Sequence, residues 1–132
     1  AMAMGTDLLP TVLDLLQLPA PKDRLLDGRS ILNVLTSGAA TPHDYLYYYD
    51  GETLFAVRNQ RFKYRGPAGV FYSTDQTPIG AAVPQKEWLF DLAGDRRESY
   101  DTSDHSPQEL QRLRDAFTAK NKEMAVNQRG WN

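Results

Sequence analysis

Alternating apolar and polar residues in the middle of the chain predict an antiparallel sheet. Four short runs have the length and aromatic or β-branched content of strands, namely 45–49, 53–58, 61–65 and 88–92. Asp50-Gly51 and Asn59-Gln60 separate the first three runs and favour tight turns. The first three strands therefore form a meander, and the fourth returns to it after a long connection.

The first apolar stretch follows helical spacing, through Leu8, Leu9, Val12, Leu13, Leu15, Leu16 and Leu18. Thr6 or Asp7 is suited to cap this helix, and Pro10 falls in its first turn, where a missing N–H costs least. The apolar residues cover more than a narrow stripe, so the helix needs burial on two sides. Two interpretations stay open: burial in an ordinary core, or burial against a larger partner domain.

A long helix is predicted near the end of the chain. The tetrapeptide 106–109, Ser-Pro-Gln-Glu, is a capping box with proline at the first helical position. The helix should run from 107 to 125, with an apolar stripe of Leu110, Leu113, Phe117 and Met124. A short helix at 31–35, capped by Ser30, precedes the sheet. The predicted class is α+β: a four-stranded antiparallel sheet packed against a long C-terminal helix, preceded by an apolar N-terminal helix.

Size and charge restrict the classes of function. The 132 residues suffice for one modest domain, and 41% hydrophobic content indicates folding. A net charge of −2 is too balanced to indicate a nucleic-acid or anionic-membrane partner. No apolar run approaches the roughly 18–20 residues of a membrane span. Without cysteine, the chain has no disulfide, thiolate metal site or cysteine nucleophile.

The residues alone indicate no active site. His43 and His105 lie next to aspartates, but in turn-rich segments where adjacent side chains diverge, so we expect neither to be functional. Asp50 and Glu52 with His43 supply too few converging oxygens for a hard cation. No serine lies in a nucleophile elbow, and no glycine-rich phosphate loop is present.

Four short motifs, in order along the chain, resemble segments of the arylsulfatase-type sulfatases. They are 6–15 (DLLPT in that family), 26–30 (LDG), 55–64 (AVR…KY) and 89–101 (LYDLxxDPxE). In the last motif Arg96 replaces the proline of the family pattern, so a looser turn is expected after Asp95. Physically, this stretch joins the fourth strand to the final helix. We interpret its acidic residues as turn and surface residues.

The resemblance implies the C-terminal part of an enzyme that hydrolyses sulfate esters in a large alkaline-phosphatase-like α/β domain. In that family the nucleophile is a formylglycine, made from cysteine or serine in a C/S-x-P-x-R motif, beside a calcium ion. This chain has neither that motif nor the family's acidic metal motifs, so we assign it no catalytic or metal residue. Calcium and formylglycine are expected in the missing catalytic domain.

The resemblance also implies a domain division and a partner. Residues 1–42 would be the N-terminal helix and linker, ending the catalytic domain, and residues 43–132 would be the C-terminal α+β domain. The fragment would be inactive, would pack on its own catalytic domain, and would hold residues 66–86 near the substrate. Candidate substrate-proximal residues in that long connection are Phe71, Tyr72, Ser73 and Gln85. A periplasmic or secreted location is compatible with such a parent protein.

Two other classes of function compete with this interpretation. A free-standing module could bind sulfated carbohydrate through the tyrosines of 45–49 or through Arg61, Lys63 and Arg65. Cross-strand packing of the tyrosines and a solvated cationic face are the alternatives to that binding role. An assembly domain would instead form a homo-oligomer through an exposed N-terminal helix.

Overall fold

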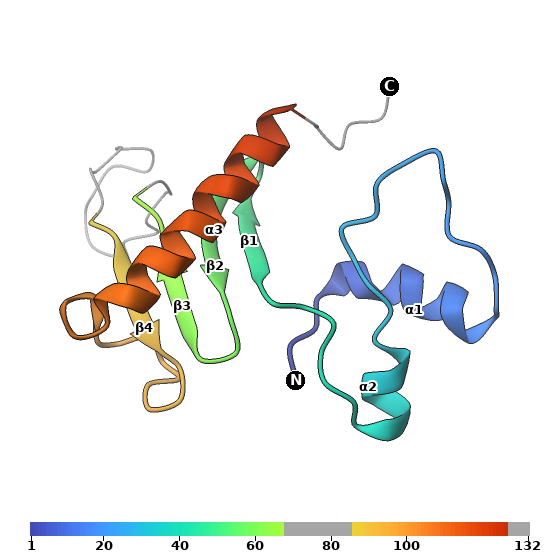
Figure 1. Ribbon diagram of the computed structural model, residues 1–132, viewed down its shortest axis with the longest axis horizontal. Coiled ribbons are helices and arrows are strands. Elements are labelled where there is room, and N and C mark those ends of the chain that lie inside the picture. The colour runs from blue at the N-terminus through green and yellow to red at the C-terminus, as the bar shows by residue number, and fades with distance from the viewer. Residues whose placement is uncertain (68–85, 127–132) are drawn as a thin grey trace, which may run out of the picture. The chain divides into compact units, whose positions relative to one another are not determined.

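The computed structural model describes residues 1–67 and 86–126 (Figure 1). The chain divides into two compact units, residues 1–46 and the residues from 47 onward. In order, the elements are η1 (Gly5–Asp7), α1 (Leu8–Leu15), α2 (Leu32–Ser37), β1 (Leu46–Asp50), β2 (Thr53–Arg58), β3 (Phe62–Arg65), β4 (Trp88–Asp91), η2 (Ser103–His105) and α3 (Pro107–Val126). The predicted α+β class is confirmed, with its four-stranded sheet, long C-terminal helix and apolar N-terminal helix.

In the first unit, the short 3₁₀ helix η1 runs directly into α1. Pro10 lies in the first turn of α1, as predicted. The helix ends at Leu15, before the predicted end at Leu18, because Gln17 adopts a left-handed φ of 56°. The Leu18 N–H then bonds back to the Leu13 carbonyl at 2.8 Å. The apolar residues beyond α1 therefore lie in a tight turn rather than on the helix.

The second helix of this unit, α2, begins one residue later than predicted and ends two residues later. Its N-cap position is Ile31, whose side chain makes no capping bond. The predicted cap Ser30 accepts a hydrogen bond from the Leu32 N–H at 3.3 Å. Gly38 ends the helix with a left-handed φ of 68°, a conformation that favours glycine.

In the second unit, the four strands are hydrogen-bonded in chain order, β1-β2-β3-β4. Val57 of β2 lies opposite Tyr64 of β3, which lies opposite Leu89 of β4. Both predicted turns are present: Gly51 has a left-handed φ of 58°. Asn59 closes the second turn, because its Oδ1 accepts the N–H groups of the two residues 61 and 62 at 2.9 and 2.7 Å. The predicted strand bounds hold for β2 and are one residue too long for β3 and β4.

One face of this sheet packs against α3, which crosses it in Figure 1. Opposed residues of a sheet share a face, so Val57, Tyr64 and Leu89 lie together, and all three are buried. From α3, Leu113 and Phe117 are buried, and the Phe117 ring meets the Tyr64 ring edge-to-face at 5.4 Å. Burial raises the pKa of Tyr64 to about 12. These buried residues form an apolar core between the sheet and α3, as the apolar stripe of the predicted C-terminal helix requires.

Gly66 is the residue at which the chain leaves β3. A Cβ added here would lie 2.5 Å from Cζ of Phe117, so a side chain at this position would displace the ring. The preceding residue, Arg65, is paired with Trp88 at the start of β4. The connection between them thus begins and ends on neighbouring strands. Across the described residues, no helix is both long and apolar enough to cross a membrane.

Candidate functional site

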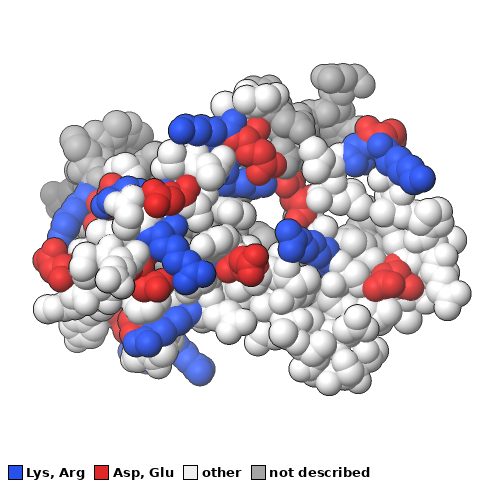
Figure 2. All heavy atoms as spheres, viewed as in Figure 1, with Lys and Arg blue, Asp and Glu red and all other residues white. Residues whose placement is uncertain are grey.

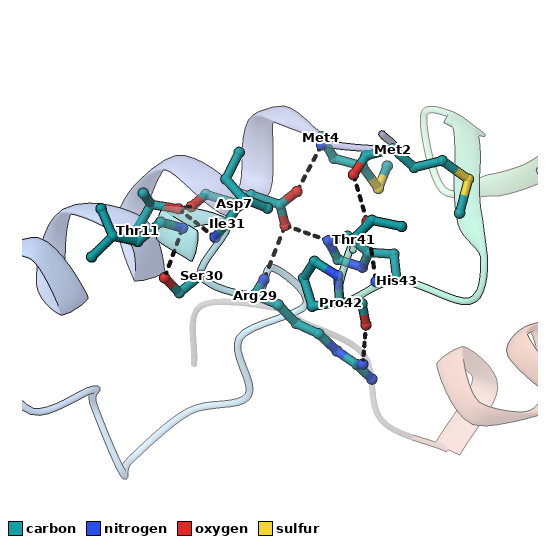
Figure 3. Close-up of polar contacts among 11 residues, drawn as sticks. Met2, Met4, Asp7, Thr11, Arg29, Ser30, Ile31, Thr41, Pro42 and His43 are labelled. Carbon is teal, nitrogen blue, oxygen red and sulfur yellow. Dashed lines mark hydrogen bonds and ion pairs between the residues drawn. The ribbon is translucent and has the colours of Figure 1, made fainter. Parts of the chain in front are cut away.

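The buried carboxylate of Asp7 is the centre of the largest polar cluster in the first unit (Figure 3). Its Oδ2 accepts the Met4 N–H at 2.7 Å, and its Oδ1 accepts the Arg29 N–H at 2.9 Å. Nε2 of His43 also lies 2.9 Å from Oδ1. Three segments that are distant in sequence therefore converge on one carboxylate. We call Asp7, with Met4, Arg29 and His43, the Asp7 hub.

Of the two predicted cap residues, Thr6 and Asp7, Asp7 takes the N-cap position of α1 but does not use its side chain to cap that helix. The carboxylate points instead at Arg29 and His43, because a fully buried charge must be satisfied wherever donors are available. Its own carbonyl accepts the Thr11 hydroxyl at 2.6 Å, and Thr11 Oγ1 accepts the Ile31 N–H at 3.0 Å.

Gly28 explains how the 28–31 segment reaches the Asp7 hub. A Cβ on Gly28 would lie 2.0 Å from the Thr6 carbonyl oxygen and 2.9 Å from the Asp7 nitrogen. Backbone therefore passes directly against backbone at this point, which only glycine permits. The glycine of the 26–30 motif is therefore needed for this close approach.

Further polar contacts close the first unit around the hub (Figure 3). The Arg29 guanidinium donates to the Pro42 carbonyl at 2.6 Å, and the Thr41 hydroxyl donates to the Met2 carbonyl at 2.7 Å. Ser30 donates to the Asp14 carboxylate. The start of the chain, the 28–31 segment and the 41–43 segment are thus tied to one another mainly by polar bonds.

The electrostatics of Asp7 favour its ionised form. Burial raises its pKa, but the hydrogen bonds from the Arg29 and Met4 N–H groups and from His43 outweigh that effect, so the pKa lies below its ordinary value. An Asp–His pair resembles part of a catalytic triad, but among the described contacts the His43 ring bonds to Asp7, and the nearby Thr41 hydroxyl accepts the backbone N–H of His43 at 3.3 Å rather than a bond from the ring. The described contacts of the Asp7 hub therefore tie segments of the first unit to one another.

The apolar surface of α1 faces outward. Leu8 is 66% exposed and Leu15 is 63% exposed, and the exposed fractions of Leu9, Val12, Leu16 and Leu18 lie between 49% and 59%. We call these six residues the leucine face. In Figure 2 the surface of α1 and α2 is mainly uncharged, whereas charged side chains of both signs gather over α3 and the sheet. The predicted need for burial on two sides is not met within the described chain.

The predicted cationic row begins with Arg61 and Lys63, and both are compensated by carboxylates. The Arg61 guanidinium lies 2.7 Å from Asp91. Lys63 Nζ lies 2.8 Å from both carboxylate oxygens of Glu98 and 5.0 Å from the centre of the Tyr48 ring. Glu98 reaches this position with a left-handed φ of 56°.

Arg65, the third cation of that row, is half-buried among aromatic rings. Its guanidinium carbon lies 4.6 Å from the Phe55 ring centre and 5.3 Å from the Trp88 ring centre. Burial lowers its pKa from the ordinary arginine value. The expectation of three solvent-facing cations therefore holds for Arg61 alone, because Lys63 and Arg65 are covered by neighbouring side chains.

The tyrosines of β1 do not form a single exposed platform. Tyr47 lies beneath Lys120 of α3, whose Nζ is 5.4 Å from the ring centre, and Tyr48 is covered by Lys63. Both rings are partly buried, and Tyr49 alone of the strand's tyrosines is exposed. This arrangement supports packing rather than ligand stacking as the use of the tyrosines.

The acidic residues after β4 organise a turn, as predicted. The Asp95 carboxylate accepts the N–H groups of Arg97, Ser99 and Tyr100 at 3.2, 2.6 and 2.8 Å. This carboxylate closes the turn even though Arg96 stands where the family pattern has proline.

Asp101 fastens the end of that turn to the sheet. Its Oδ1 accepts the N–H groups of Leu89 and Ser103 at 3.1 and 3.0 Å, and Lys86 lies 3.1 Å from its Oδ2. Burial raises the pKa of Asp101, but these hydrogen bonds outweigh it, so the pKa is lowered. The stretch that joins the sheet to α3 is thereby held by carboxylates, none of which serves chemistry here.

The remaining candidate residues do not assemble into a site. His105 is exposed in η2, and Asp50 and Glu52 are exposed at the β1–β2 turn. Within residues 1–67 and 86–126, no group of three or more His, Asp or Glu side chains is placed to hold a metal ion. The described residues therefore do not fit a calcium site. The predicted substrate-proximal residues Phe71, Tyr72, Ser73 and Gln85 lie outside the described residues.

Comparison with known proteins gives the following matches. No protein-family model matches the sequence. An arylsulfatase of Hemicentrotus pulcherrimus is 42% identical over 57 residues, which is 43% of this chain and 10% of that protein. Arylsulfatase D of Homo sapiens is 34% identical over 79 residues, which is 58% of this chain and 13% of that protein. The chain thus matches only about a tenth of the length of these curated relatives.

Solved structures show the same fold. One, from work on the metabolism of multiple glycosaminoglycans by Bacteroides thetaiotaomicron, superposes with a TM-score of 0.69 and 22% identity over 88% of this chain and 24% of that one. Another, solved in complex with its substrate D-glucosamine-2-N,6-O-disulfate, has a TM-score of 0.58 and 22% identity over 93% of this chain and 24% of that one. Together with the arylsulfatase matches, they confirm the resemblance to the C-terminal domain of arylsulfatase-type sulfatases.

Proposed function

We propose that this chain is the C-terminal part of an enzyme that hydrolyses sulfate esters, and that it supplies packing and substrate-entrance surfaces rather than catalytic groups. The observation that carries the proposal is the match to two arylsulfatases, each far longer than the matched segment. Formylglycine and calcium would belong to the catalytic domain of that enzyme.

Residues 1–42 would pack against that catalytic domain through the leucine face. Six large apolar side chains on one short segment are about half exposed or more. Fully burying a leucine is worth roughly 1.5–3 kcal/mol, so covering this face provides a strong driving force for docking. Residues 43–132 would then form the smaller α+β domain that flanks the catalytic domain.

The connection after Gly66 would shape the substrate entrance. Its two ends are held by the β3–β4 pairing and by the ring of Phe117 beneath Gly66. A segment held this way presents its side chains from a rigid base. Phe71, Tyr72, Ser73 and Gln85 are the candidates to contact the part of the substrate that surrounds the sulfate ester.

Turnover of an aryl sulfate ester tests the proposal. The 132-residue chain should be inactive, whereas the longer polypeptide that contains it should be active and should lose activity when residues 1–132 are deleted. As a control, the deleted polypeptide should regain activity when the chain is added in trans. Turnover by the chain alone, abolished by His43→Ala or by replacing a serine, would refute the inactive-fragment proposal.

Two competing functions are separated by solution measurements. A sulfated-glycan binding module predicts salt-sensitive binding that Arg61→Ala with Lys63→Ala abolishes, although the ion pairs of both cations with Asp91 and Glu98 weigh against it. An assembly domain predicts a homo-oligomer that dissociates on dilution, detected by light scattering. The leucine face fits that outcome physically, so the dilution series is an essential control.

A further inference from the structure

The described part of the first unit buries a polar cluster beside only three large apolar side chains, Met2, Ile31 and Leu46. Asp7 is fully buried, and Thr11 and His43 are buried with it, whereas six of the large apolar side chains of the same unit are exposed. We propose that Asp7 is a positioning residue: its carboxylate, held by the Met4, Arg29 and His43 donors, keeps α1 folded so that the leucine face is ready to dock. The identity of the docking partner in this inference, the catalytic domain, rests on the proposed function.

The connectivity of the Asp7 hub supports this role. Each of its three donors belongs to a different segment: Met4 precedes α1, Arg29 lies in the connection to α2, and His43 lies just before β1. Hydrogen bonds to an ionised acceptor are the stronger kind, and loss of the acceptor removes the partner of the part-buried Met4 and Arg29 N–H groups. One carboxylate therefore controls whether three segments stay together.

The other charged groups near the hub do not replace this carboxylate. The Arg29 guanidinium is committed to the Pro42 carbonyl, and Asp14 accepts from Ser30 on an exposed side of α1. Asp44 follows His43 but is exposed. No further acidic side chain contacts the Arg29 N–H or the His43 ring among the described residues, so Asp7 has no substitute.

The same geometry makes the first unit sensitive to acid. The pKa of Asp7 is lower in the folded unit than in the unfolded chain, so its contribution is present above the unfolded value near 3.8 and is lost as pH falls through the folded value. Protonation removes an acceptor lone pair from the hub and loosens α1. Asp101 in the second unit also has a lowered pKa, so the order in which the two units lose protection, rather than acid sensitivity itself, reports on Asp7.

Hydrogen–deuterium exchange of the full chain at neutral pH tests the inference. Asp7→Asn should speed exchange of the α1 amides and of the Arg29 and Ile31 amides by at least about tenfold, and should leave β2 and β3 amides unchanged. Asp23→Asn is the matched control, since it makes the same chemical change at an exposed residue that pairs with its neighbour Arg24, and should leave exchange near wild type. Wild-type exchange in Asp7→Asn, or an equal rise across the sheet, would overturn the inference.

Acid titration of the unsubstituted chain covers the case in which Asp7→Asn does not fold. As pH falls below the ordinary aspartate range, about 4, the α1 amides should lose protection before those of β2 and β3. Simultaneous loss in both units would contradict the role of Asp7.

Association with the longer polypeptide that lacks residues 1–132 separates this inference from the proposed function. Leu9→Ser with Val12→Ser should weaken association while exchange at the Asp7 hub stays at the wild-type rate, because both side chains are exposed. Asp7→Asn should weaken association and speed exchange together. Normal association of the Leu9/Val12 variant would overturn the docking role in the proposed function, whereas normal exchange in Asp7→Asn would overturn the role of Asp7 alone.

Discussion

In the second unit, Leu113 and Tyr64 are buried between α3 and the sheet, and charged side chains lie on the surface. In the first unit, the fully buried residue is Asp7, and Leu15 is 63% exposed. The second unit therefore has the distribution expected of an independent domain, with apolar groups inside. The first unit has the distribution expected of a piece whose apolar surface is completed by another surface.

This difference separates two ways of holding a short chain together. An apolar core gains free energy in proportion to the area that it removes from water, whatever the exact contacts. A polar cluster gains little unless every buried donor and acceptor is paired, and it loses much when one partner is removed. The first unit should therefore be the more sensitive to small changes at its centre and the less sensitive to changes in its leucines.

The largest effect in the first unit is expected for Gly28→Ala. The added methyl group would lie 2.0 Å from the Thr6 carbonyl oxygen, where backbone cannot yield easily, so the free energy of unfolding of the first unit should fall by about 3 kcal/mol. Exchange of α1 amides against urea concentration measures this change. Gly5→Ala is the matched control, because no heavy atom lies within 4 Å of its added Cβ. Equal stability of the two variants would disprove the close backbone packing.

A comparison of Leu113→Ala with Leu15→Ala tests the contrast between the two units directly, since both variants replace a leucine by alanine. Leu113 is 0% exposed, so its truncation should lower the free energy of unfolding of the second unit by about 2–5 kcal/mol. Leu15 is 63% exposed, so its truncation should change stability by less than about 0.5 kcal/mol. Urea denaturation of the isolated chain measures both. A comparable loss in the two variants would show that α1 is buried in solution.

The smallest effect is expected at the ion pairs. Glu98→Gln removes the charge that pairs with Lys63, whose side chain is 17% exposed, and should lower the stability of the second unit by about 1 kcal/mol. Asp23→Asn breaks the pair with Arg24 on the surface of the first unit and should cause no measurable change. Thermal melts at low and high salt compare the two. A larger loss of stability in Asp23→Asn than in Glu98→Gln would show that the first unit, rather than the second, depends on its ion pairs.

The second unit could be predicted well from the sequence because its signals are local. The alternation of apolar residues located β2 within its true bounds, Asp50-Gly51 located the first turn, and the capping box located the start of α3 at Pro107. Each of these signals lies within a few residues of the structure that it specifies. Arg61 and Leu92, by which the predicted third and fourth strands exceed β3 and β4, still form a backbone hydrogen bond at 2.8 Å just beyond those strands.

The centre of the first unit could not be predicted in this way. Asp7 before an apolar helical run has the pattern of an N-cap, and nothing near it indicates that its partners lie 22 and 36 residues further on, at Arg29 and His43. Gly28 lies in a turn-like context, and its close approach to Thr6 depends on tertiary packing. One available signal was a surplus of leucines in α1, which indicated burial outside an ordinary small core.

The pairing of Arg65 with Trp88, next to Gly66, has a consequence for how this fold can diversify. The two ends of the connection are neighbours on adjacent strands, so its length and composition can change without altering the strand register beneath it. The sheet and α3 thus form a fixed frame on which the connection between β3 and β4 can vary. Under the proposed function, replacing this connection would change selectivity, while Gly66 and the Phe117 ring keep its starting point constant.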